Sequence, residues 1–394
     1  MASAAAPQGA LTKKRKGRLF YFALGFDMPF FILLMLVLAV GLVSLFSASF
    51  AYAYYWNDGD SYYYIKRQLI FAAIGIVAML LISTVDYNFL RKLKIPYIVM
   101  GISIALLILV LFLPPIKEVH RWIKIGSLRI QPSEIAKFAV VLLFSYWIAE
   151  FGNDMKTMKK GFFPFMAALG VVCLLVFREP HLSGTMLILM IGMVMMFIGG
   201  TKWYYLLGTL GLGGAAAAAL IFIGGYERDR IDVWLDPFAV YTSGGAGRDS
   251  AWQTVQSLYA IGSGGLMGEG LGNSRQKHLF LPEPQNDFIF AVVCEEMGFI
   301  GAVLIIILFA LLVWRGFVIG MKAPDRFGSM LAIGLTAQIG IQVLFNLAVV
   351  TNTIPNTGIS LPFFSYGGSS LVMLLAQMGV VLAISRRMKD KNDS

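Results

Sequence analysis

Charged residues are scarce in this sequence of 394 residues: Asp, Glu, Lys and Arg together make up 14%. A soluble globular domain carries about a quarter, so the low charge excludes that class. The only cysteines are Cys173 and Cys294, each inside an apolar run, which excludes a disulfide-stapled secreted scaffold and a cysteine-based metal site. The three histidines, His120, His181 and His278, are scattered, so a histidine-rich zinc site is not expected.

Hydrophobic residues are abundant instead, at 58% of the chain with a mean hydropathy of +0.74. A helix needs about 20 apolar residues to cross a bilayer, and such runs recur along the whole sequence. They predict an all-α polytopic membrane protein with ten transmembrane helices. The predicted spans are 28–48, 68–85, 95–114, 135–150, 162–178, 183–200, 203–225, 288–314, 328–350 and 367–385.

The net charge of +10 comes from short basic clusters between the apolar runs. This distribution is typical of the positive-inside rule and of contact with membrane lipid, and it disfavours a nucleic-acid partner. The clusters lie in residues 1–27, in the loops after every second span, and in 386–394. We therefore expect two cytoplasmic tails, 1–27 and 386–394, around a ten-span domain over 28–385.

Two segments between spans are predicted to lie outside the cell. Residues 115–134 are basic, which either marks an amphipathic segment on the membrane surface, with Trp122 at the interface, or a site for an anion. Residues 226–287 form a loop of unusual length, and such loops are either functional or disordered. Their Trp, Tyr, Leu and Ile content argues against disorder.

Asp287 stands at the start of the eighth predicted span, at the end of the Pro-rich stretch 281–284. One interpretation is an N-terminal cap, because Asp favours that position and the helix dipole stabilises its carboxylate. The other is a general base at the outer membrane boundary. Further down the same span, Glu295 and Glu296 are interpreted as buried structural or proton-linked groups.

The fourth span begins at QPSEIAK, with Ser133 as its expected cap. Glu134 and Lys137 are three residues apart and share a helix face, which favours a local ion pair. Because an unpaired ammonium inside a membrane is unfavourable, Lys137 should face a cavity or another carboxylate, possibilities that include Asp287.

The tenth span begins with SYGGSSL, residues 365–371. A helix N-terminus presents unpaired backbone N–H groups and can bind phosphate, although small residues there also serve helix packing. The candidate residues are Ser365, Gly367, Gly368 and Ser369. No Walker-type phosphate loop and no nucleophile elbow stands out elsewhere in the sequence.

Several long motifs resemble the SEDS proteins (shape, elongation, division, sporulation), the family of FtsW and RodA. They are YIKRQL (64–69), RWIKIG (121–126), QPSEIAK (131–137), EPHLSGT (179–185), WLDP (234–237), the block 260–302 and TGISLPFFSYGGSSL (357–371). The resemblance covers nearly the whole chain and leans to the FtsW type. EPHLSGT departs from the family's QPDLGT, which leaves the role of His181 open.

The resemblance implies a ten-span SEDS fold and a peptidoglycan glycosyltransferase in the bacterial cytoplasmic membrane. Such enzymes polymerise lipid II at the outer face of that membrane, beside a class B penicillin-binding protein that crosslinks the product. Asp287 matches the family's essential acid. The substrate-binding motifs carry over to Arg121, Trp122, Ser133, Glu134 and Lys137.

From this we expect Asp287 to take the proton of the acceptor sugar hydroxyl while undecaprenyl diphosphate leaves with inversion. The leaving diphosphate needs cations or fixed hydrogen-bond donors. The candidates are Lys137, Arg121 and the N-terminus of the tenth span, followed by Arg67 and Lys277. The resemblance also implies a divalent cation (Mg²⁺ or Mn²⁺), although the sequence shows no carboxylate cluster that would hold one.

Two alternatives remain at this point. A lipid II flippase would use the same charged cavity without forming glycan. A non-catalytic scaffold for the penicillin-binding protein would need no charged groups at the outer helix ends.

Overall fold

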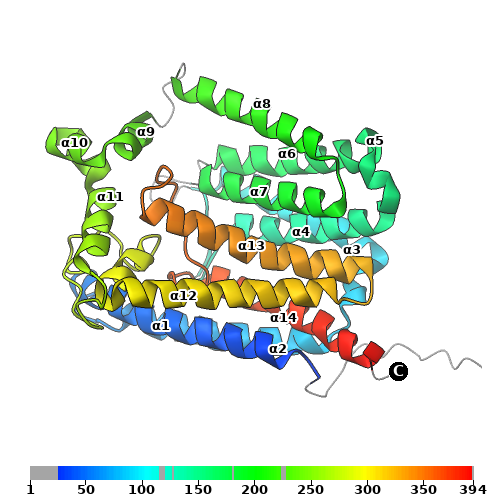
Figure 1. Cartoon of the computed structure of the whole chain (residues 1–394), viewed down its shortest axis with the longest axis horizontal. Coiled ribbons are helices and arrows are strands. Elements are labelled where there is room, and N and C mark those ends of the chain that lie inside the picture. Colours follow the sequence, from blue (N-terminus) through cyan, green and yellow to red (C-terminus); the bar gives the residue numbers. More distant parts are fainter. Residues whose placement is uncertain (1–24, 115–119, 127, 180–181, 223–227, 393–394) are drawn as a thin grey trace, which may run out of the picture.

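The computed structural model describes residues 25–114, 120–126, 128–179, 182–222 and 228–392, which are almost wholly helical (Figure 1). The long helices are α1 (Met28–Trp56), α2 (Tyr63–Thr84), α3 (Ile95–Phe112), α4 (Pro132–Phe151), α6 (Phe163–Arg178), α7 (Leu182–Gly199), α8 (Trp203–Phe222), α12 (Ile289–Met321), α13 (Arg326–Val350) and α14 (Gly368–Asn392). The short elements are η1 (Tyr87–Lys94), η2 (Gly152–Lys156), α5 (Met158–Gly161), α9 (Arg228–Leu235), α10 (Pro237–Thr242), α11 (Gly245–Ser263) and the strands β1 (Ile123–Ile125) and β2 (Leu128–Ile130).

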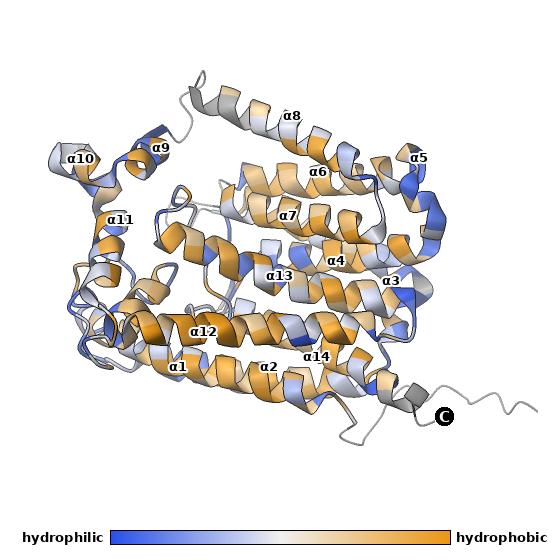
Figure 2. Cartoon of the chain, in the orientation of Figure 1, coloured by the Kyte–Doolittle hydropathy of each residue, from blue (hydrophilic) through white to orange (hydrophobic). Residues whose placement is uncertain are grey.

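Hydrophobic residues run along the long helices, while hydrophilic residues gather at their ends and in the short elements (Figure 2). Within the described residues, nine helices are long and apolar enough to cross a membrane. They match nine of the ten predicted spans. The remaining span, 203–225, is helical as α8, and its residues 223–225 lie outside the described part. The chain is thus a multi-pass α-helical membrane protein.

Some helices extend well beyond the predicted spans, because backbone hydrogen bonding does not stop where the apolar run stops. Helix α1 continues to Trp56, α12 to Met321 and α14 to Asn392. The expected tail 386–394 is therefore helical as far as Asn392. Arg315, which the sequence placed in a loop, lies within α12.

The two unusual inter-span segments also contain ordered structure. The basic segment 115–134 includes the antiparallel hairpin β1–β2, in which Ile123 faces Ile130. Its residues 115–119 and 127 lie outside the described part. The long segment 226–287 contains α9, α10 and α11, followed by the irregular stretch 264–288. This agrees with its apolar content.

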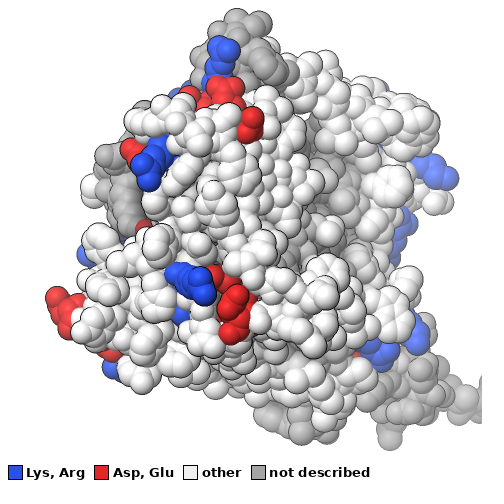
Figure 3. Space-filling view, turned by 60° about the vertical axis from the view of Figure 1, so that its left-hand side comes forward, with Lys and Arg blue, Asp and Glu red and all other residues white. Residues whose placement is uncertain are grey.

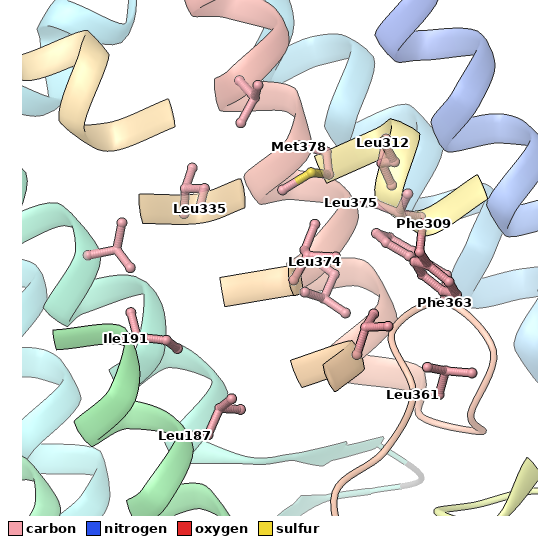
Figure 4. Close-up of a cluster of buried hydrophobic side chains, with 14 of the residues drawn as sticks. Leu187, Ile191, Phe309, Leu312, Leu335, Leu361, Phe363, Leu374, Leu375 and Met378 are labelled. Carbon is pink, nitrogen blue, oxygen red and sulfur yellow. The ribbon is translucent and has the colours of Figure 1, made fainter. Parts of the chain in front are cut away.

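The core lies where α7, α12, α13 and α14 meet (Figure 4). Leucine, isoleucine, phenylalanine and methionine side chains from separate helices pack there against the segment before α14. The labelled residues are Leu187, Ile191, Phe309, Leu312, Leu335, Leu361, Phe363, Leu374, Leu375 and Met378. This packing places the starts of α12 and α14 at the same end of the bundle, which is also the end that carries α9, α10 and α11 (Figure 1).

Helix α12 is broken at Gly298, whose backbone is left-handed (φ +65°). Four main-chain hydrogen bonds join the break to the stretch that follows α11. The N–H groups of Glu269 and Gly270 donate to the carbonyls of Glu295 (2.9 Å) and Glu296 (3.0 Å), and the N–H groups of Phe299 and Ile300 donate to the carbonyls of Gly265 (2.9 Å) and Leu266 (3.2 Å). The break thus attaches the irregular stretch to the membrane helix.

At the opposite end of the bundle, ion pairs join helices that are distant in sequence. Asp27, which precedes α1, pairs with Arg315 of α12 at 2.6 Å. The Asp27 N–H also donates to the Ser385 hydroxyl of α14 at 3.0 Å. Arg387 of α14 pairs with Asp86 beside η1. The first and last helices therefore meet at this end.

We predict that Gly298→Ala lowers stability by about 1–3 kcal/mol, the cost of a non-glycine residue in a strained backbone conformation. A methyl group there would also lie 2.3 Å from the Gly268 nitrogen. Thermal unfolding in detergent measures the effect. The control is Gly208→Ala in α8, where nothing lies within 4 Å of the added methyl. Equal melting temperatures for the two variants would contradict the prediction.

Candidate functional site

Asp287 lies in the irregular stretch, two residues before α12 begins. The N-cap of α12 is Phe288, and no side chain caps that helix. The interpretation of Asp287 as a helix cap is therefore wrong. Its side chain is partly exposed, so the carboxylate is available for another purpose.

The position of Asp287 is set from α13. The Asn346 side chain amide donates to the Asp287 carbonyl at 2.7 Å and to the Ile359 carbonyl at 2.6 Å. This places the segment before α14 against Asp287. A Cβ atom built on Gly358, which has φ +69°, would lie 3.1 Å from Asp287 Oδ2. The glycine thus makes room for one carboxylate oxygen.

The surroundings of Asp287 favour its neutral form more than water would. The pKa of the carboxyl is raised to about 6: burial contributes most, the negative charge of Glu283 also raises it, and the positive charge of Arg121 opposes both effects. The Asn286 side chain amide donates to Glu283 at 2.7 Å, and Glu283 has a left-handed backbone (φ +44°). The loop therefore keeps a second acid beside the first.

Lys137 is buried, with 4% of its surface exposed, and it forms the predicted ion pair with Glu134 at 2.8 Å. Its ammonium also donates to Gln342 of α13 at 3.4 Å. The alternative pairing with Asp287 is not formed in the described structure. Gln342 in turn donates to the Ser360 carbonyl at 3.0 Å, so the ion pair is joined to the same segment that faces Asp287.

Ser133 does not cap α4. That helix begins at Pro132, two residues earlier than a Ser133 cap would require, and its N-cap is Gln131. Within the part of the chain that the structure describes, the buried Ser133 hydroxyl has no hydrogen-bond partner. It remains a polar group close to the Glu134–Lys137 pair.

The start of α14 lies beside the Asp287 loop, as the candidate anion site required. The Ser365 hydroxyl donates to the Asn286 carbonyl and accepts from the Leu361 N–H, both at 2.8 Å. Ser365 therefore holds the loop rather than presenting a free hydroxyl. Gly367 donates its N–H to Gln68 of α2 at 3.3 Å.

Gly368 and Ser369 form the first turn of α14. A methyl group on Gly368 would lie 2.4 Å from the Phe71 ring, so this glycine allows α2 to approach. The Ser369 hydroxyl is buried, and the structure assigns it no partner among the described residues. The first turn of α14 is thus tightly packed against α2, and its Ser369 hydroxyl makes no hydrogen bond to the described residues.

The cationic candidates differ in how they are held. Arg67 of α2 lies over the Tyr63 ring, 4.2 Å from its centroid, and hydrogen-bonds Tyr366 beside α14. Arg121 and Trp122 lie just before β1 and are partly exposed. The charge of Arg121 acts on the Asp287 carboxyl and opposes the rise of its pKa.

Lys277 belongs to the scaffold. It is buried, pairs with Glu296 at 2.7 Å and donates to the Ser47 hydroxyl of α1 at 3.1 Å. Its charge is already balanced there. Glu295 accepts hydrogen bonds from the Ser274 hydroxyl and from the Arg275 N–H at 2.9 Å. Both glutamates are therefore buried, as the sequence predicted.

Charged side chains form a few separate patches on the end of the molecule that carries α9–α11, and most of that surface is uncharged (Figure 3). His181 lies outside the described residues.

The sequence did not predict that Glu283, Asn346 and Gly358 surround Asp287. Their proximity to Asp287 depends on loop conformation or on contacts between distant segments.

A sequence profile described as "Cell cycle protein", for the FtsW, RodA and SpoVE group, matches residues 27–390. The chain belongs to this family. Stage V sporulation protein E of Bacillus subtilis is 42% identical in sequence to this chain. The match covers 91% of this chain and 97% of the relative. A probable peptidoglycan glycosyltransferase FtsW of Geobacter sp. (strain M18) is 37% identical over 93% of this chain and 98% of its own.

Solved structures of the family share the fold. A chain from a peptidoglycan synthase complex, whose structure concerns the coordination of polymerization and crosslinking, superimposes with a TM-score of 0.76 at 26% identity, over 93% of this chain and 99% of its own. The Rod shape determining protein RodA of Thermus thermophilus superimposes with a TM-score of 0.67 at 27% identity. The match covers 92% of this chain and 97% of the RodA chain.

We predict that Lys137→Met lowers stability by about 3–5 kcal/mol, because it leaves the Glu134 carboxylate, only 12% exposed, without its cation. Adding Glu134→Gln to that variant should recover most of the loss. Lys66→Met is the matched control: Lys66 pairs with Asp60 at 3.2 Å in an exposed pair, which is worth about 1 kcal/mol or less. Chemical or thermal unfolding of the four proteins measures both effects. Similar losses at Lys137 and Lys66 would contradict the prediction.

Proposed function

We propose that this protein is a peptidoglycan glycosyltransferase that polymerises lipid II into β-1,4-linked glycan, with Asp287 as the general base. The observation that carries the proposal is the position of Asp287: a partly exposed carboxyl at a helix end, with a pKa of about 6 and Arg121 close by. A base with a pKa slightly below neutrality is ionised at pH 7 and still accepts a proton readily. The relatives named above support the reaction class.

In the proposed reaction the ionised Asp287 accepts the proton of the acceptor's C4 hydroxyl as that oxygen attacks the anomeric carbon of the lipid-linked donor. The bond from the anomeric carbon to the diphosphate oxygen breaks on the opposite face, and undecaprenyl diphosphate leaves. A single displacement inverts the configuration, so an α-linked donor gives a β bond. Only one base is needed.

The leaving diphosphate gains negative charge, which fixed cations and hydrogen-bond donors stabilise. Arg121 is the first candidate, since it is partly exposed and its charge acts on Asp287. The first turn of α14 with Ser369, and Arg67 beside Tyr366, are further candidates. The Glu134–Lys137 pair keeps its charges matched and contributes polarity and rigidity beneath the site.

A divalent cation stays a proposal. Across the described ranges, no place gathers three or more His, Cys, Asp or Glu side chains. The side chains of these described ranges therefore do not fit a resident metal site. A magnesium or manganese ion would instead arrive with the diphosphate of the substrate.

The cellular setting follows from the same assignment. We expect the end of the bundle opposite Asp287, and with it both termini, to lie in the cytoplasm, because the positive-inside rule favours the cytoplasmic side for the basic residues of η1 and of the end of α14. Asp287 then lies at the outer face, where the sugars of lipid II are found. A class B penicillin-binding protein is the proposed partner, because a glycan polymerase needs a crosslinking enzyme beside it.

We predict that Asp287→Asn lowers lipid II polymerisation by about 10²–10⁴-fold, the usual contribution of a general base. A gel assay of glycan products, with and without the partner, measures the loss. Asp249→Asn in α11, where the side chain is exposed, is the control and should polymerise normally. Polymer from Asp287→Asn at the wild-type rate would remove the base assignment. A wild-type protein that translocates lipid II but forms no polymer would be a flippase, and one that does neither would be a scaffold.

We predict that the wild-type rate rises as pH increases through about 6, because Asp287 must lose its proton to act as a base. Glu283→Gln removes the negative charge that raises the pKa of Asp287, so the rise should move to lower pH. The exposed Glu269→Gln is the control and should leave the profile in place. A profile of Glu283→Gln that coincides with the wild type would contradict the prediction.

A further inference from the structure

Glu179 is a buried acid that the proposed reaction leaves unused. It directly follows α6, and none of its surface is exposed. Neither carboxyl oxygen has a hydrogen-bond partner among the residues that the structure describes. An ionised carboxylate without hydrogen bonds is costly to bury, so this side chain needs an explanation.

The one described charge that acts on the Glu179 carboxyl belongs to Arg121. The Arg121 Nε group also donates to the Glu179 main-chain carbonyl, with a distance of 3.4 Å. This contact places the guanidinium beside Glu179. Because the same guanidinium acts on Asp287, Arg121 lies within the influence of two carboxyls on different segments.

The two carboxyls compete for the same cation. If both were ionised, Glu179 would attract the guanidinium towards the interior and away from Asp287. If Glu179 is neutral, that attraction disappears. Burial favours the neutral state, since it removes water from the carboxyl and provides no hydrogen bonds in return.

We propose that Glu179 is a positioning residue for Arg121: its carboxyl stays uncharged while the enzyme works, and so leaves the guanidinium to Asp287 and to the diphosphate groups. This proposal rests on the proposed glycosyltransferase function. When Asp287 takes up its proton it loses its hold on Arg121. The guanidinium is then available to the negative charge that appears on the leaving diphosphate, provided that Glu179 does not compete for it.

The proposal predicts an upper pH limit for activity. The pKa of Glu179 is raised to about 8, because burial outweighs the opposing effect of the Arg121 charge. The other charged groups in this arrangement are Asp287 and Glu283, which act on each other. As pH rises through about 8, Glu179 ionises and binds Arg121. At pH 9 the wild-type rate should therefore fall to about a tenth of its rate at pH 7.

The test measures initial rates of lipid II polymerisation by the full-length protein with its partner, at pH 7 and pH 9. Glu179→Gln and Glu179→Met cannot ionise, so each should raise the ratio of the pH 9 rate to the pH 7 rate about tenfold over wild type. Two variants are used so that a failure of one to fold leaves the other informative. Glu150→Gln, an exposed acid of α4 that pairs with Arg91 at 3.5 Å, is the control and should keep the wild-type ratio.

The role of Arg121 is tested in the same assay. In an Arg121→Gln background, Glu179→Gln should no longer change the ratio, because the cation through which it acts is missing. A purely structural role for Glu179 would lower both rates together and leave the ratio unchanged. A wild-type ratio in Glu179→Gln would overturn the inference, while a wild-type protein that makes no polymer at pH 7 would overturn the proposed function itself.

Discussion

Two adjacent carboxylates inside a membrane helix have to be neutralised, and much of the site depends on how this is done. Glu296 of α12 pairs with Lys277, and Glu295 accepts hydrogen bonds from Ser274 and the Arg275 N–H. All three partners come from the irregular stretch 264–288. The stretch is therefore bound to α12 by charge and hydrogen bonds, which bury well only when every member has a partner. Asp287 lies at the end of that stretch.

A second layer of contacts turns this anchorage into a defined position for one carboxylate. Asn346 of α13 holds the Asp287 and Ile359 carbonyls, and Ser365 holds the Asn286 carbonyl. Most of these bonds go to backbone atoms, so they restrict the path of the chain without using the carboxylate itself. The acid is left with a shifted pKa and a nearby cation, which is the combination that a general base requires.

The sequence predicted most of the fold because the membrane imposes a simple rule. Long apolar runs must be helical there, since the bilayer offers no other partner for the backbone. The predictions were weaker where local pattern carries little information. Strands of three residues such as β1 are too short to show a period, and α9–α11 lie in a segment that reads as a loop. Helix ends were misplaced where helices such as α12 continue past their apolar residues.

The functional site likewise contains residues whose contacts the sequence predicted and residues whose contacts it did not. The Glu134–Lys137 pair was predictable because its members are three residues apart on one helix. The ion pair of Lys277 was not predicted, because its partner Glu296 comes close only when the loop folds onto α12. The contacts of Asn346 and Glu179 could not be predicted, although Glu179 begins the motif EPHLSGT, since each acts on a residue that is far away along the chain. Contacts of that kind require a three-dimensional structure.

The contact between Asp27 and Ser385 brings the start of α1 beside the end of α14. The helical domain is in this sense a closed ring, whose cyclic order of helices does not depend on where the polypeptide is cut. A short peptide could join these two points, and new termini could then be opened in a loop elsewhere without reordering the helices. The two ends of the described helical domain thus have the proximity that circular permutation requires, which a bundle with its ends on opposite membrane faces lacks.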